Sequence, residues 1–433
     1  MQIAWKALLM AALLPILPAR AETRFVTSDA DAGEGTLRAA LLAAGSGDAI
    51  EFAIDGEDVK TIYLESELPP VPAGATIDGC TQSGAVCASS PPTLMVELEG
   101  GGTPPGASGL RIQANGVTVR GLVVNSFPLH GVLVSNAGHT VIETCRIGTD
   151  VTGTLDFGNG GDGIFLEAAS DTRIGGSTPA GNLISANAAN GIEIGALSSG
   201  TQLLDNRIGT DATDMAALPN GEAGVFILDA ATGSEVEANT IRFNSGGGVV
   251  VTGTGTLGHR IRTNSMSENG NNGIDLVGEF FEDANDEDDP DAGPNRLQNW
   301  PEMASATWSP GPQRLDVEVY VPTAPANASF PLTLDFYRAD VDAEEGEVYL
   351  GTAPFTVQDF ESGSALVHLS PGPGLVQVGD VVVATATDAD GNSSEFSDDG
   401  VTLPEPDTAF TDLLAMAALP LGATAARRKR ANS

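Results

Sequence analysis

The sequence, 433 residues long, is poor in positive charge. It has 20 Lys and Arg residues against 58 Asp and Glu residues, and its formal net charge at pH 7 is −38. Six of the bases but only three of the acids lie in residues 1–21 and 404–433, so the body between these ends is more acidic still. Nucleic acids and anionic membrane surfaces are themselves negative, so both are excluded as partners of this body.

Cysteine is also scarce, with three residues in the chain. Cys80 and Cys87 have six residues between them, and a small disulfide-closed loop is one arrangement that an oxidising compartment would allow. The spacing alone leaves open whether the two cysteines pair. Cys145 lies in an apolar run typical of a strand, where a buried, unreactive thiol is expected.

Motifs of familiar catalytic sites are missing. The sequence contains no G-x-S-x-G or H-E-x-x-H motif and no phosphate-binding loop, and its glycine runs punctuate strands. A glycosidase needs two carboxylates at a defined separation, but no pair stands out among so many acids. The four histidines do not cluster, so we expect them to be structural or superficial: His130, His139, His259 and His368. No catalytic residue is predicted.

The N-terminal 21 residues have the pattern of a secretory signal peptide. Lys6 precedes a short apolar run over residues 7–17, and Ala19-Arg20-Ala21 provides a small-x-small cleavage site. The apolar run is shorter than the about 20 residues needed to cross a bilayer. We therefore predict that the chain is exported.

The C-terminal end carries a second signal. Pro404-Glu405-Pro406 is followed by a mostly apolar stretch over residues 409–426 and by four bases over residues 427–430. This order predicts a marginal membrane helix whose basic end stays in the cytoplasm. It resembles the PEP-CTERM sorting signal of Gram-negative bacteria, and the resemblance implies processing near Pro404-Glu405-Pro406 by an exosortase-like enzyme. A plain tail is the alternative, because Asp412, Pro420 and Thr424 interrupt the apolar stretch.

The body of the chain repeats itself. Residues 146–166 match residues 207–227 without a gap, and each segment begins with Arg-Ile-Gly-Thr-Asp. A shorter unit, which runs from Asn through a second Asn to Gly and an alternating apolar strand, recurs at residues 182–194, 239–251 and 264–276. Repeats of this size bury their apolar face only by stacking, which indicates a parallel β-helix of roughly seven or eight coils over residues 110–276.

Two kinds of repeat residue have expected roles in this stack. Gly191, Gly248 and Gly273 are expected to form corners with positive φ. The asparagines of the repeat are expected to stack and to hydrogen-bond from coil to coil: Asn187, Asn244 and Asn269. Near the N-terminus, Thr36 is expected to cap a short helix that ends at Gly45 and covers the open end of the stack.

Most of residues 25–300 resembles the exported bacterial right-handed parallel β-helix repeat proteins, which have a pectate-lyase-like fold. The segments that carry the resemblance are Gly35–Leu41, Asp48–Phe52, Ala75–Gly79, the two Ile-Gly-Thr-Asp units and Gly293–Asn299. The resemblance implies a secreted or surface-exposed protein of a Gram-negative bacterium, held only transiently in the inner membrane by its tail. It leaves catalysis open, because the fold is shared with polysaccharide-cleaving enzymes.

Residues 301–403 have a different pattern. Alternating strands such as 315–321 and 332–336, separated by turn residues, predict an immunoglobulin-like antiparallel sandwich. The complete prediction is therefore an all-β chain: a signal peptide (1–21), an N-terminal cap with the first coils (22–109), a right-handed parallel β-helix (110–300), a β-sandwich (301–403) and a sorting tail (404–433).

An acidic junction over residues 279–295 separates the two units. Dense carboxylates repel one another unless a cation joins them, and Ca²⁺ takes six to eight oxygen ligands in flexible geometry. The predicted Ca²⁺ ligands are Asp283, Asp286, Asp288, Asp289 and Asp291. A solvated acidic loop is the alternative, because the spacing matches no EF-hand.

Two functions remain after the sequence has been considered. We predict a non-catalytic surface or matrix protein that binds extracellular polysaccharide. The alternative is a Ca²⁺-dependent polysaccharide lyase, epimerase or hydrolase, which would need Ca²⁺ or basic side chains near an acidic substrate. Arg146 and Arg207 recur in the repeat as scaffold residues do. An outer face that gathers Asp, Arg and an aromatic shelf outside the repeat positions would favour the enzyme.

Overall fold

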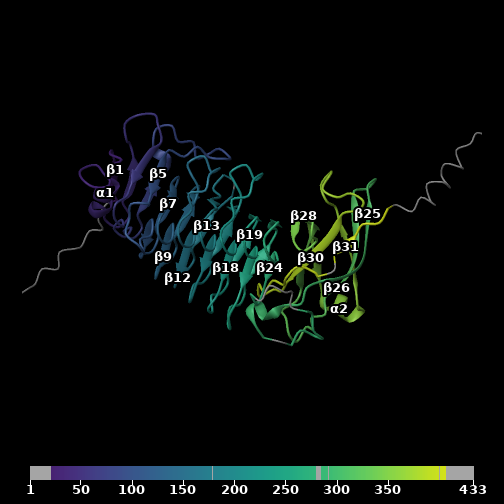
Figure 1. The fold of residues 1–433 in the computed structure, drawn as a ribbon. Coiled ribbons are helices and arrows are strands. Elements are labelled where there is room, and N and C mark those ends of the chain that lie inside the picture. The colour runs from purple at the N-terminus through teal and green to yellow at the C-terminus, as the bar shows by residue number, and fades with distance from the viewer. Residues whose placement is uncertain (1–20, 178, 279–283, 291, 399, 406–433) are drawn as a thin grey trace, which may run out of the picture.

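The computed structural model describes residues 21–405, apart from residues 178, 279–283, 291 and 399. The chain winds into an elongated stack of coils that is followed by a separate antiparallel unit at its C-terminal end (Figure 1). Each complete coil gives one short strand to each of three parallel sheets. The predicted combination of a right-handed parallel β-helix with an antiparallel sandwich is confirmed.

Sheet 1 has nine strands in chain order: β1 (Thr23–Val26), β2 (Ala49–Phe52), β4 (Thr76–Asp78), β7 (Thr118–Arg120), β10 (Val141–Glu143), β13 (Arg173–Gly175), β16 (Gln202–Leu204), β19 (Glu235–Glu237) and β22 (Arg260–Arg262). Sheet 2 has eight: β3 (Lys60–Tyr63), β5 (Val96–Glu99), β8 (Val123–Asn125), β11 (Arg146–Ile147), β14 (Leu183–Ile184), β17 (Arg207–Ile208), β20 (Thr240–Arg242) and β23 (Ser265–Ser267).

Sheet 3 has seven strands, in agreement with the expected number of coils: β6 (Leu110–Ile112), β9 (Val132–Ser135), β12 (Ile164–Glu167), β15 (Ile192–Ile194), β18 (Val225–Ile227), β21 (Val249–Val251) and β24 (Ile274–Asp275). Side chains alternate between inside and outside along every strand. The inward positions are Ile, Val and Leu, as in Ile164 and Leu166 of β12, and they form one continuous buried core.

A short helix covers the N-terminal end of this core. The helix α1 (Leu37–Ala43) begins after Thr36, whose Oγ1 accepts a hydrogen bond from the backbone N–H of Ala39 at 3.2 Å. Leu37 and Leu41 are buried in the core of the coils. The helix ends at Ala43 with Ala44 as its C-cap, just before Gly45, where the sequence predicted its end. The first coil therefore has a covered apolar end, as predicted from the sequence.

Two buried ladders of asparagine run along the stack. One joins Asn182, Asn206, Asn239 and Asn264 through side-chain hydrogen bonds of 2.9–3.0 Å. The other joins Asn159, Asn187, Asn220, Asn244 and Asn269 at 2.8–3.0 Å. In each step the amide Nδ2 donates to the Oδ1 of the next coil. The predicted stacking of Asn187, Asn244 and Asn269 is thus present, with Asn220 as a further member between the first two.

The prediction for the repeat glycines was wrong. Gly191, Gly248 and Gly273 are not among the residues with positive φ. Gly191 and Gly248 allow close packing between coils, since a Cβ on Gly191 would lie 2.6 Å from the carbonyl oxygen of Gly224. Gly273 allows close packing against the sandwich, where a Cβ would lie 2.8 Å from the Phe396 ring. Left-handed backbone occurs instead at the residues that precede several of the ladder asparagines, such as Asp205 with φ 56°, and at other glycines, such as Gly148 and Gly209.

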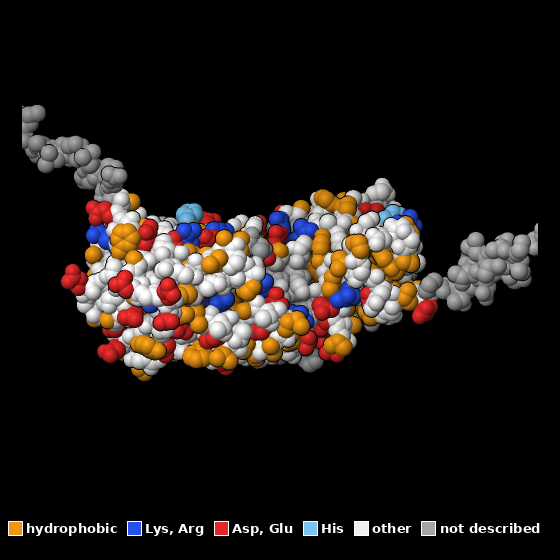
Figure 2. Space-filling view, turned by 90° about the horizontal axis from the view of Figure 1, so that it is seen from above, with side chains coloured by type: hydrophobic (Ala, Val, Ile, Leu, Met, Phe, Trp, Pro, Cys, Tyr) orange, Lys and Arg blue, Asp and Glu red, His pale blue; other side chains and the backbone are white. Residues whose placement is uncertain are grey.

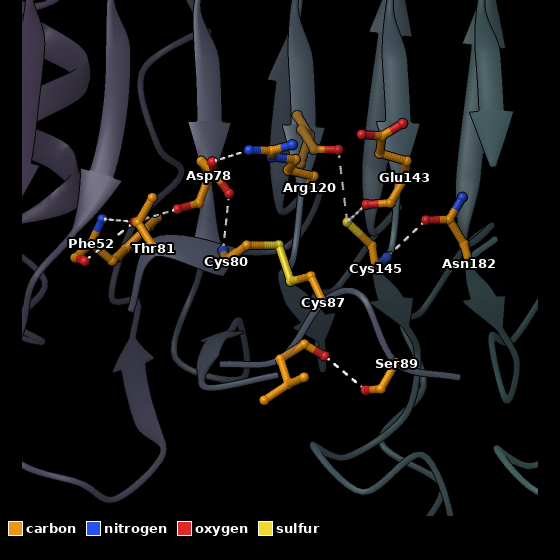
Figure 3. Close-up of a disulfide and its surroundings, with 12 residues drawn as sticks. Phe52, Asp78, Cys80, Thr81, Cys87, Ser89, Arg120, Glu143, Cys145 and Asn182 are labelled. Carbon is orange, nitrogen blue, oxygen red and sulfur yellow. Dashed lines mark hydrogen bonds and ion pairs between the residues drawn. A yellow bond between two sulfur atoms is a disulfide. The ribbon is translucent and has the colours of Figure 1, made fainter. Parts of the chain in front are cut away.

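Cys80, in the 3₁₀ helix η1 (Gly79–Thr81), forms a disulfide with Cys87 in the loop that follows (Figure 3). The loop closed by this bond lies next to the first coils, where Asp78 accepts a hydrogen bond from the backbone N–H of Cys80 at 3.0 Å. Cys145 is a buried thiol, and burial raises its pKa to about 12. Cys145 is therefore a packing residue, as its apolar strand predicted.

The antiparallel unit consists of two facing sheets. One contains β25 (Glu302–Ser309), β26 (Arg314–Tyr320) and β29 (Ala365–Leu369). The other contains β27 (Leu332–Ala339), β28 (Gly346–Phe355), β30 (Val381–Thr387) and β31 (Val401–Thr402), and the short helix α2 (Val357–Ser362) follows β28. The core between the sheets includes Leu334, Phe336 and Phe355, all fully buried.

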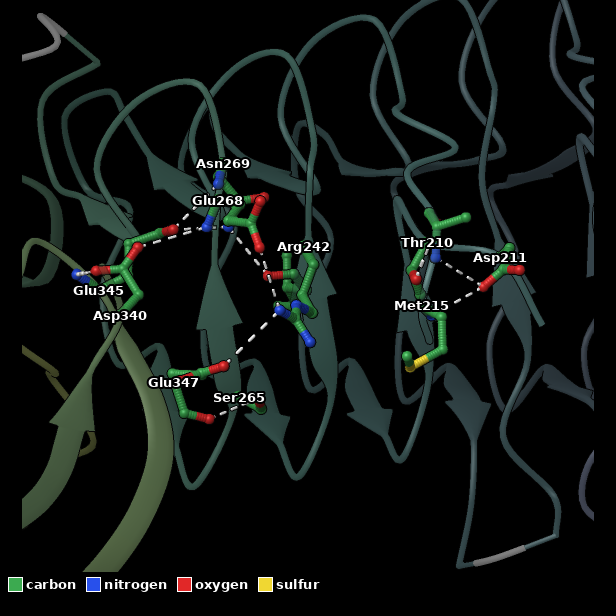
Figure 4. A network of polar contacts seen from close by, with 12 residues as sticks. Thr210, Asp211, Met215, Arg242, Ser265, Glu268, Asn269, Asp340, Glu345 and Glu347 are labelled. Atoms are coloured by element: carbon green, nitrogen blue, oxygen red, sulfur yellow. Dashed lines mark hydrogen bonds and ion pairs between the residues drawn. The ribbon is translucent and has the colours of Figure 1, made fainter. Parts of the chain in front are cut away.

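This sandwich covers the C-terminal end of the coils. Tyr337 and Phe396 belong to the buried core of the β-helix and lie edge to face with ring centroids 5.4 Å apart. Tyr337 Oη accepts a hydrogen bond from the backbone N–H of Thr263 at 2.8 Å. The longer asparagine ladder ends on a sandwich carboxylate, because Asn269 Nδ2 donates to Glu345 Oε1 at 2.7 Å (Figure 4). The two units therefore share packing and hydrogen bonds at this end.

A connecting segment fastens the two units together. It includes the 3₁₀ helix η2 (Pro294–Leu297), whose Asn295 is fully buried. Asn295 Nδ2 donates to the carbonyl oxygens of His259 at 2.8 Å and Ser393 at 3.0 Å. The segment that matched the family pattern in sequence is therefore a junction between the last coil and the sandwich.

Acidic side chains outnumber basic ones on the visible face of the protein (Figure 2). On the face shown in Figure 2, Asp and Glu side chains are spread over both units, while Lys and Arg side chains are fewer. Within the part of the chain that the structure describes, no helix is long and apolar enough to span a membrane.

Candidate functional site

The outer face of sheet 3 carries a column of large side chains. Strand pairing brings one outward residue of each strand into register from β6 to β24: Arg111, Leu133, Phe165, Glu193, Phe226, Val250 and Asp275. Neighbouring members are one strand spacing apart, about 4.8 Å. The phenyl rings of Phe165 and Phe226 thus flank the carboxylate of Glu193. Stacking of the coils does not require particular side chains on this outer face.

A polar cluster lies beside this column, on the turns that lead into β9, β12 and β15. The His130 ring stacks on the Phe165 ring with centroids 4.7 Å apart and planes 9° from parallel. His130 Nδ1 lies 3.1 Å from Asp162 Oδ2 and also accepts from the backbone N–H of Asp162 at 3.2 Å. The imidazole is therefore fixed between an aromatic ring and a carboxylate.

Two carboxylates of the cluster share one donor. Asn190 Nδ2 donates to Asp162 Oδ1 at 3.1 Å and to Glu193 Oε2 at 3.3 Å. Burial raises the pKa of Glu193 to about 7, and the negative charge of Asp162 adds to the rise. A carboxyl group with a pKa near neutrality beside a second carboxylate is an arrangement that can exchange protons with a bound molecule.

An open groove of about 430 Å³ adjoins these residues. Its floor contains Phe226 and Val250 of the column, and its rim contains Asn190 and Glu222. The turns that lead into β18, β21 and β24 are rich in Gly and other small residues, so they leave the space above these strands unfilled. The groove combines an aromatic floor with a few polar groups at its rim, which is typical of ligand sites.

Sequence reasoning did not single out these residues. The sequence predicts a structural or superficial role for His130 and no functional role for Phe165, Glu193 or Phe226. A signal was present, because the residue between the two apolar residues of each strand must point outward. Reading that position down the repeat gives Phe, Glu, Phe, Val and Asp. The stacking of His130 on Phe165 joins residues 35 positions apart, and only the coil geometry shows it.

The acidic junction is only partly within the described residues. Asp283 and Asp291 lie outside them. Asp289 is buried, and its Oδ2 accepts from Thr323 Oγ1 at 2.7 Å, from Gln298 Nε2 at 3.0 Å and from the backbone N–H of Asn299 at 3.2 Å.

The remaining junction carboxylates have other surroundings. Asp288 is exposed, and Asp286 is half-buried with its backbone N–H donating to Asn299 Oδ1 at 3.2 Å. Over the described ranges, no group of three or more His, Cys, Asp and Glu residues has an arrangement that could hold a metal ion. The Ca²⁺ site therefore stays a prediction.

The paired Ile-Gly-Thr-Asp units have a structural role in the described coils. The Asp150 carboxylate accepts from the backbone N–H groups of Thr152, Thr154 and Leu155, and Asp211 does the same one repeat later. Arg146 donates to the carbonyl oxygens of Val151 and Pro92. These groups shape protruding loops, which agrees with the scaffold role expected for Arg146.

The predicted processing residues fall at the edges of the described chain. Ala19 and Pro406 lie outside it. Ala21, Pro404 and Glu405 are the outermost described residues, and they belong to no helix or strand. Export and sorting therefore stay predictions.

One family model matches the chain. It is described as a right handed beta helix region and covers residues 108–282. This segment contains all seven strands of sheet 3, from β6 to β24, and accounts for less than half of the chain. A comparison with curated protein sequences found no match.

Several solved structures are similar to the chain. A variant of the periplasmic alginate epimerase AlgG is 13% identical, with 52% of this chain and 47% of that chain covered and a TM-score of 0.31. For pectate lyase Pel9A the identity is 14%, the coverage 59% and 71%, and the TM-score 0.33. For the A-module of the mannuronan C-5 epimerase AlgE4 of Azotobacter vinelandii these values are 16%, 53% and 73%, and 0.29. The aligned part spans about half the length of AlgG.

Proposed function

We propose that this protein binds an extracellular polysaccharide along the outer face of sheet 3. The observation that carries the proposal is the continuous column of Phe165, Glu193, Phe226 and Val250, which opens into the groove. Phe165 and Phe226 are two coils apart, about 10 Å, which is comparable to one disaccharide repeat of an extended glycan chain. Aromatic faces supply most of the contact area for such a ligand, and the rim supplies hydrogen bonds.

Binding of glycans by the full-length protein tests the proposal. Affinity electrophoresis in gels that contain single polysaccharides should show retardation by at least one of them. Phe226→Ala should abolish the retardation, because it removes the aromatic floor of the groove. Phe25→Ala is the matched control, since Phe25 is 57% exposed on β1 and far from sheet 3. If no polysaccharide retards the protein, or if both variants behave alike, the proposal is wrong.

Glycoside hydrolysis is a second candidate, favoured by one observation. Burial raises the pKa of Glu193 to about 7, and Glu193 shares the amide of Asn190 with the carboxylate of Asp162, so this pair of carboxyl groups can hold a proton near neutral pH. Such a pair can serve as acid and base in hydrolysis. Glu193→Gln would then abolish the release of reducing sugar while binding persists. A lyase or epimerase that acts on uronates has less support, because no strand of sheet 3 from β9 to β24 contains Lys or Arg.

We also propose that the protein is exported and sorted to the cell surface. Ala19-Arg20-Ala21 would be the site of signal-peptide cleavage, and Pro404-Glu405-Pro406 the site for an exosortase-like enzyme. A disulfide between Cys80 and Cys87 suits an oxidising compartment. Mass spectrometry of the mature protein should find both termini trimmed at these sites. A mature chain that retains residues 407–433 would contradict the sorting proposal.

Calcium binding at the acidic junction completes the proposal. Thermal unfolding of the full-length protein with Ca²⁺ and with a chelator tests it, because a ligand that binds only the folded state raises the midpoint. A midpoint that is the same in both conditions would remove the calcium site.

A further inference from the structure

The groove on sheet 3 is surrounded by negative charge without basic residues. From β9 to β24, neither the strands of sheet 3 nor the turns that lead into them contain Lys or Arg. Four acids lie along the same face: Asp162, Glu193, Glu222 and Asp275. His130 lies on one of these turns, with its Nδ1 3.1 Å from Asp162 Oδ2.

The acids in and beside the groove are close enough to interact. Asp162 and Glu193 bind the same amide group of Asn190, and both Asp162 and Glu222 oppose the ionisation of Glu193. A ligand carboxylate placed here would add to this repulsion, with no cationic side chain to offset it. The groove is therefore poorly suited to a uronate polymer.

Next to the C-terminal end of the groove, the outward column ends in an acceptor oxygen that has no donor among the described residues. Asp275 continues the outward column after Val250, and its Oδ1 accepts from the backbone N–H groups of Val277 and Gly278. Val250 and Gly278 both line the groove. Asp275 is only 1% exposed, and its Oδ2 has no hydrogen-bond partner among the described residues. A buried carboxylate oxygen of this kind is best satisfied by a donor that carries positive charge.

We infer that the groove on sheet 3 selects a glycan that carries amino groups, such as a chain with unacetylated hexosamine residues. This inference rests on the proposed polysaccharide binding. A sugar ammonium group would donate hydrogen bonds to the carboxylates of Glu193 and Glu222. It would also lie near the faces of Phe165 and Phe226, which attract cations. The same aromatic rings would support the pyranose rings of the chain.

Isothermal titration of the full-length protein with three oligosaccharides of equal length tests the inference. The ligands are oligomers of glucosamine, of N-acetylglucosamine and of galacturonate. Glucosamine oligomers should bind at least about tenfold more tightly than the acetylated ones, which corresponds to about 1.4 kcal/mol. Their affinity should also fall as salt is added, because the contacts at the rim are ionic.

Variants that remove charge identify the groove as the site of this selection. Glu193→Gln and Glu222→Gln should each lower the affinity for glucosamine oligomers severalfold more than they lower the affinity for acetylated oligomers. Glu318→Gln is the matched control, since it removes the same charge from an exposed position on β26. Thermal unfolding of each variant establishes that the fold is intact.

The possible outcomes separate this inference from the proposed function. Equal affinity for glucosamine and acetylated oligomers, or tighter binding of galacturonate, would overturn the amino-sugar inference and leave polysaccharide binding in place. Binding of none of the three, together with no retardation by any polysaccharide, would overturn both. A preference for glucosamine that Glu318→Gln reduces as much as Glu193→Gln would show that overall charge, not the groove, selects the ligand.

Discussion

Arg262 and Asp335 form a two-point ion pair between the β-helix and the sandwich. Arg262 Nε lies 2.7 Å from Asp335 Oδ2, and Arg262 Nη2 lies 2.9 Å from Asp335 Oδ1. The pair joins β22, the last strand of sheet 1, to the central strand β27, and Asp335 is fully buried. Hydrogen bonding to Asp335 raises the pKa of Arg262, so the guanidinium stays charged. We therefore expect the two units to unfold together.

Asp335→Ala should destabilise the protein by about 3–5 kcal/mol. It would leave the charge of Arg262 at a partly buried interface without its partner, and that loss exceeds the value of the pair itself. Chemical denaturation of the full-length protein measures the change. The natural protein should unfold in one transition, whereas the variant should unfold at lower denaturant concentration and in two transitions, one for each unit.

Arg314→Ala provides the control for this experiment. Arg314 pairs with Asp316 on the sandwich surface, and its side chain is 52% exposed. An exposed pair contributes about 0–1 kcal/mol, so the denaturation midpoint should hardly move. Equal losses in the two variants would contradict a special role for the buried pair.

Replacing both Cys80 and Cys87 with Ser should lower the stability of the protein by about 2–3 kcal/mol. The two residues are seven positions apart, and a bond that closes a loop of this size restricts the unfolded chain by about that amount. Thermal unfolding with and without reductant measures the effect. The reductant should lower the midpoint of the natural protein and leave that of the double variant unchanged. An equal shift in both proteins would mean that the reductant acts on something other than this disulfide.

Asn220→Ala should destabilise the coils by about 1–3 kcal/mol for each buried donor that loses its acceptor. Asn220 Oδ1 accepts from both the backbone N–H and the Nδ2 of Asn187, at 3.1 and 3.0 Å, and its own Nδ2 donates to Asn244. Asn271→Ala, at a half-buried position near the same turns, serves as the comparison in thermal unfolding. If the two substitutions cost the same, the ladder does not stabilise the stack.

The repeat pattern was sufficient to predict the β-helix, its number of coils and its asparagine stacking. These features depend on residues that recur at the same place in every coil. Such residues can be identified in the sequence from their regular spacing and their residue type. The glycine prediction failed for a physical reason. A glycine at positive φ and a glycine that another backbone approaches look the same in sequence. Gly191 and Gly248 belong to the second kind.

The candidate site was harder to predict because its residues are the ones that break the repeat. His130, Asp162 and Glu193 come from three successive turns and strands, and each is an ordinary residue in its own segment. Their proximity follows from coil lengths, which vary along the chain. The sandwich contributes Glu345 to the end of the ladder from 76 residues away, and no local pattern indicates such a contact.

The contact between Asn269 and Glu345 should make stability depend on pH. Glu345 Oε1 and Oε2 accept from the Nδ2 and the backbone N–H of Asn269 at 2.7 and 3.0 Å (Figure 4). Burial nevertheless raises the pKa of Glu345 from 4.5 to about 7, and the charge of Asp340 adds to the rise. The folded state therefore binds a proton more tightly than the unfolded state does, and its advantage is full below pH 4.5 and is lost as the pH rises through about 7.

Glu345→Gln isolates this effect, because glutamine resembles the protonated acid and does not titrate. At acidic pH the variant and the natural protein should unfold at similar temperatures. As the pH rises from 4.5 to about 7, the natural protein should lose stability relative to the variant. Glu193 titrates in the same range with the same sign, so Glu193→Gln is measured alongside, and the double variant should show the sum of the two effects. A difference between Glu345→Gln and the natural protein that is constant across this range would mean that the carboxylate is ionised in both states, and that it caps the asparagine ladder as a charged group.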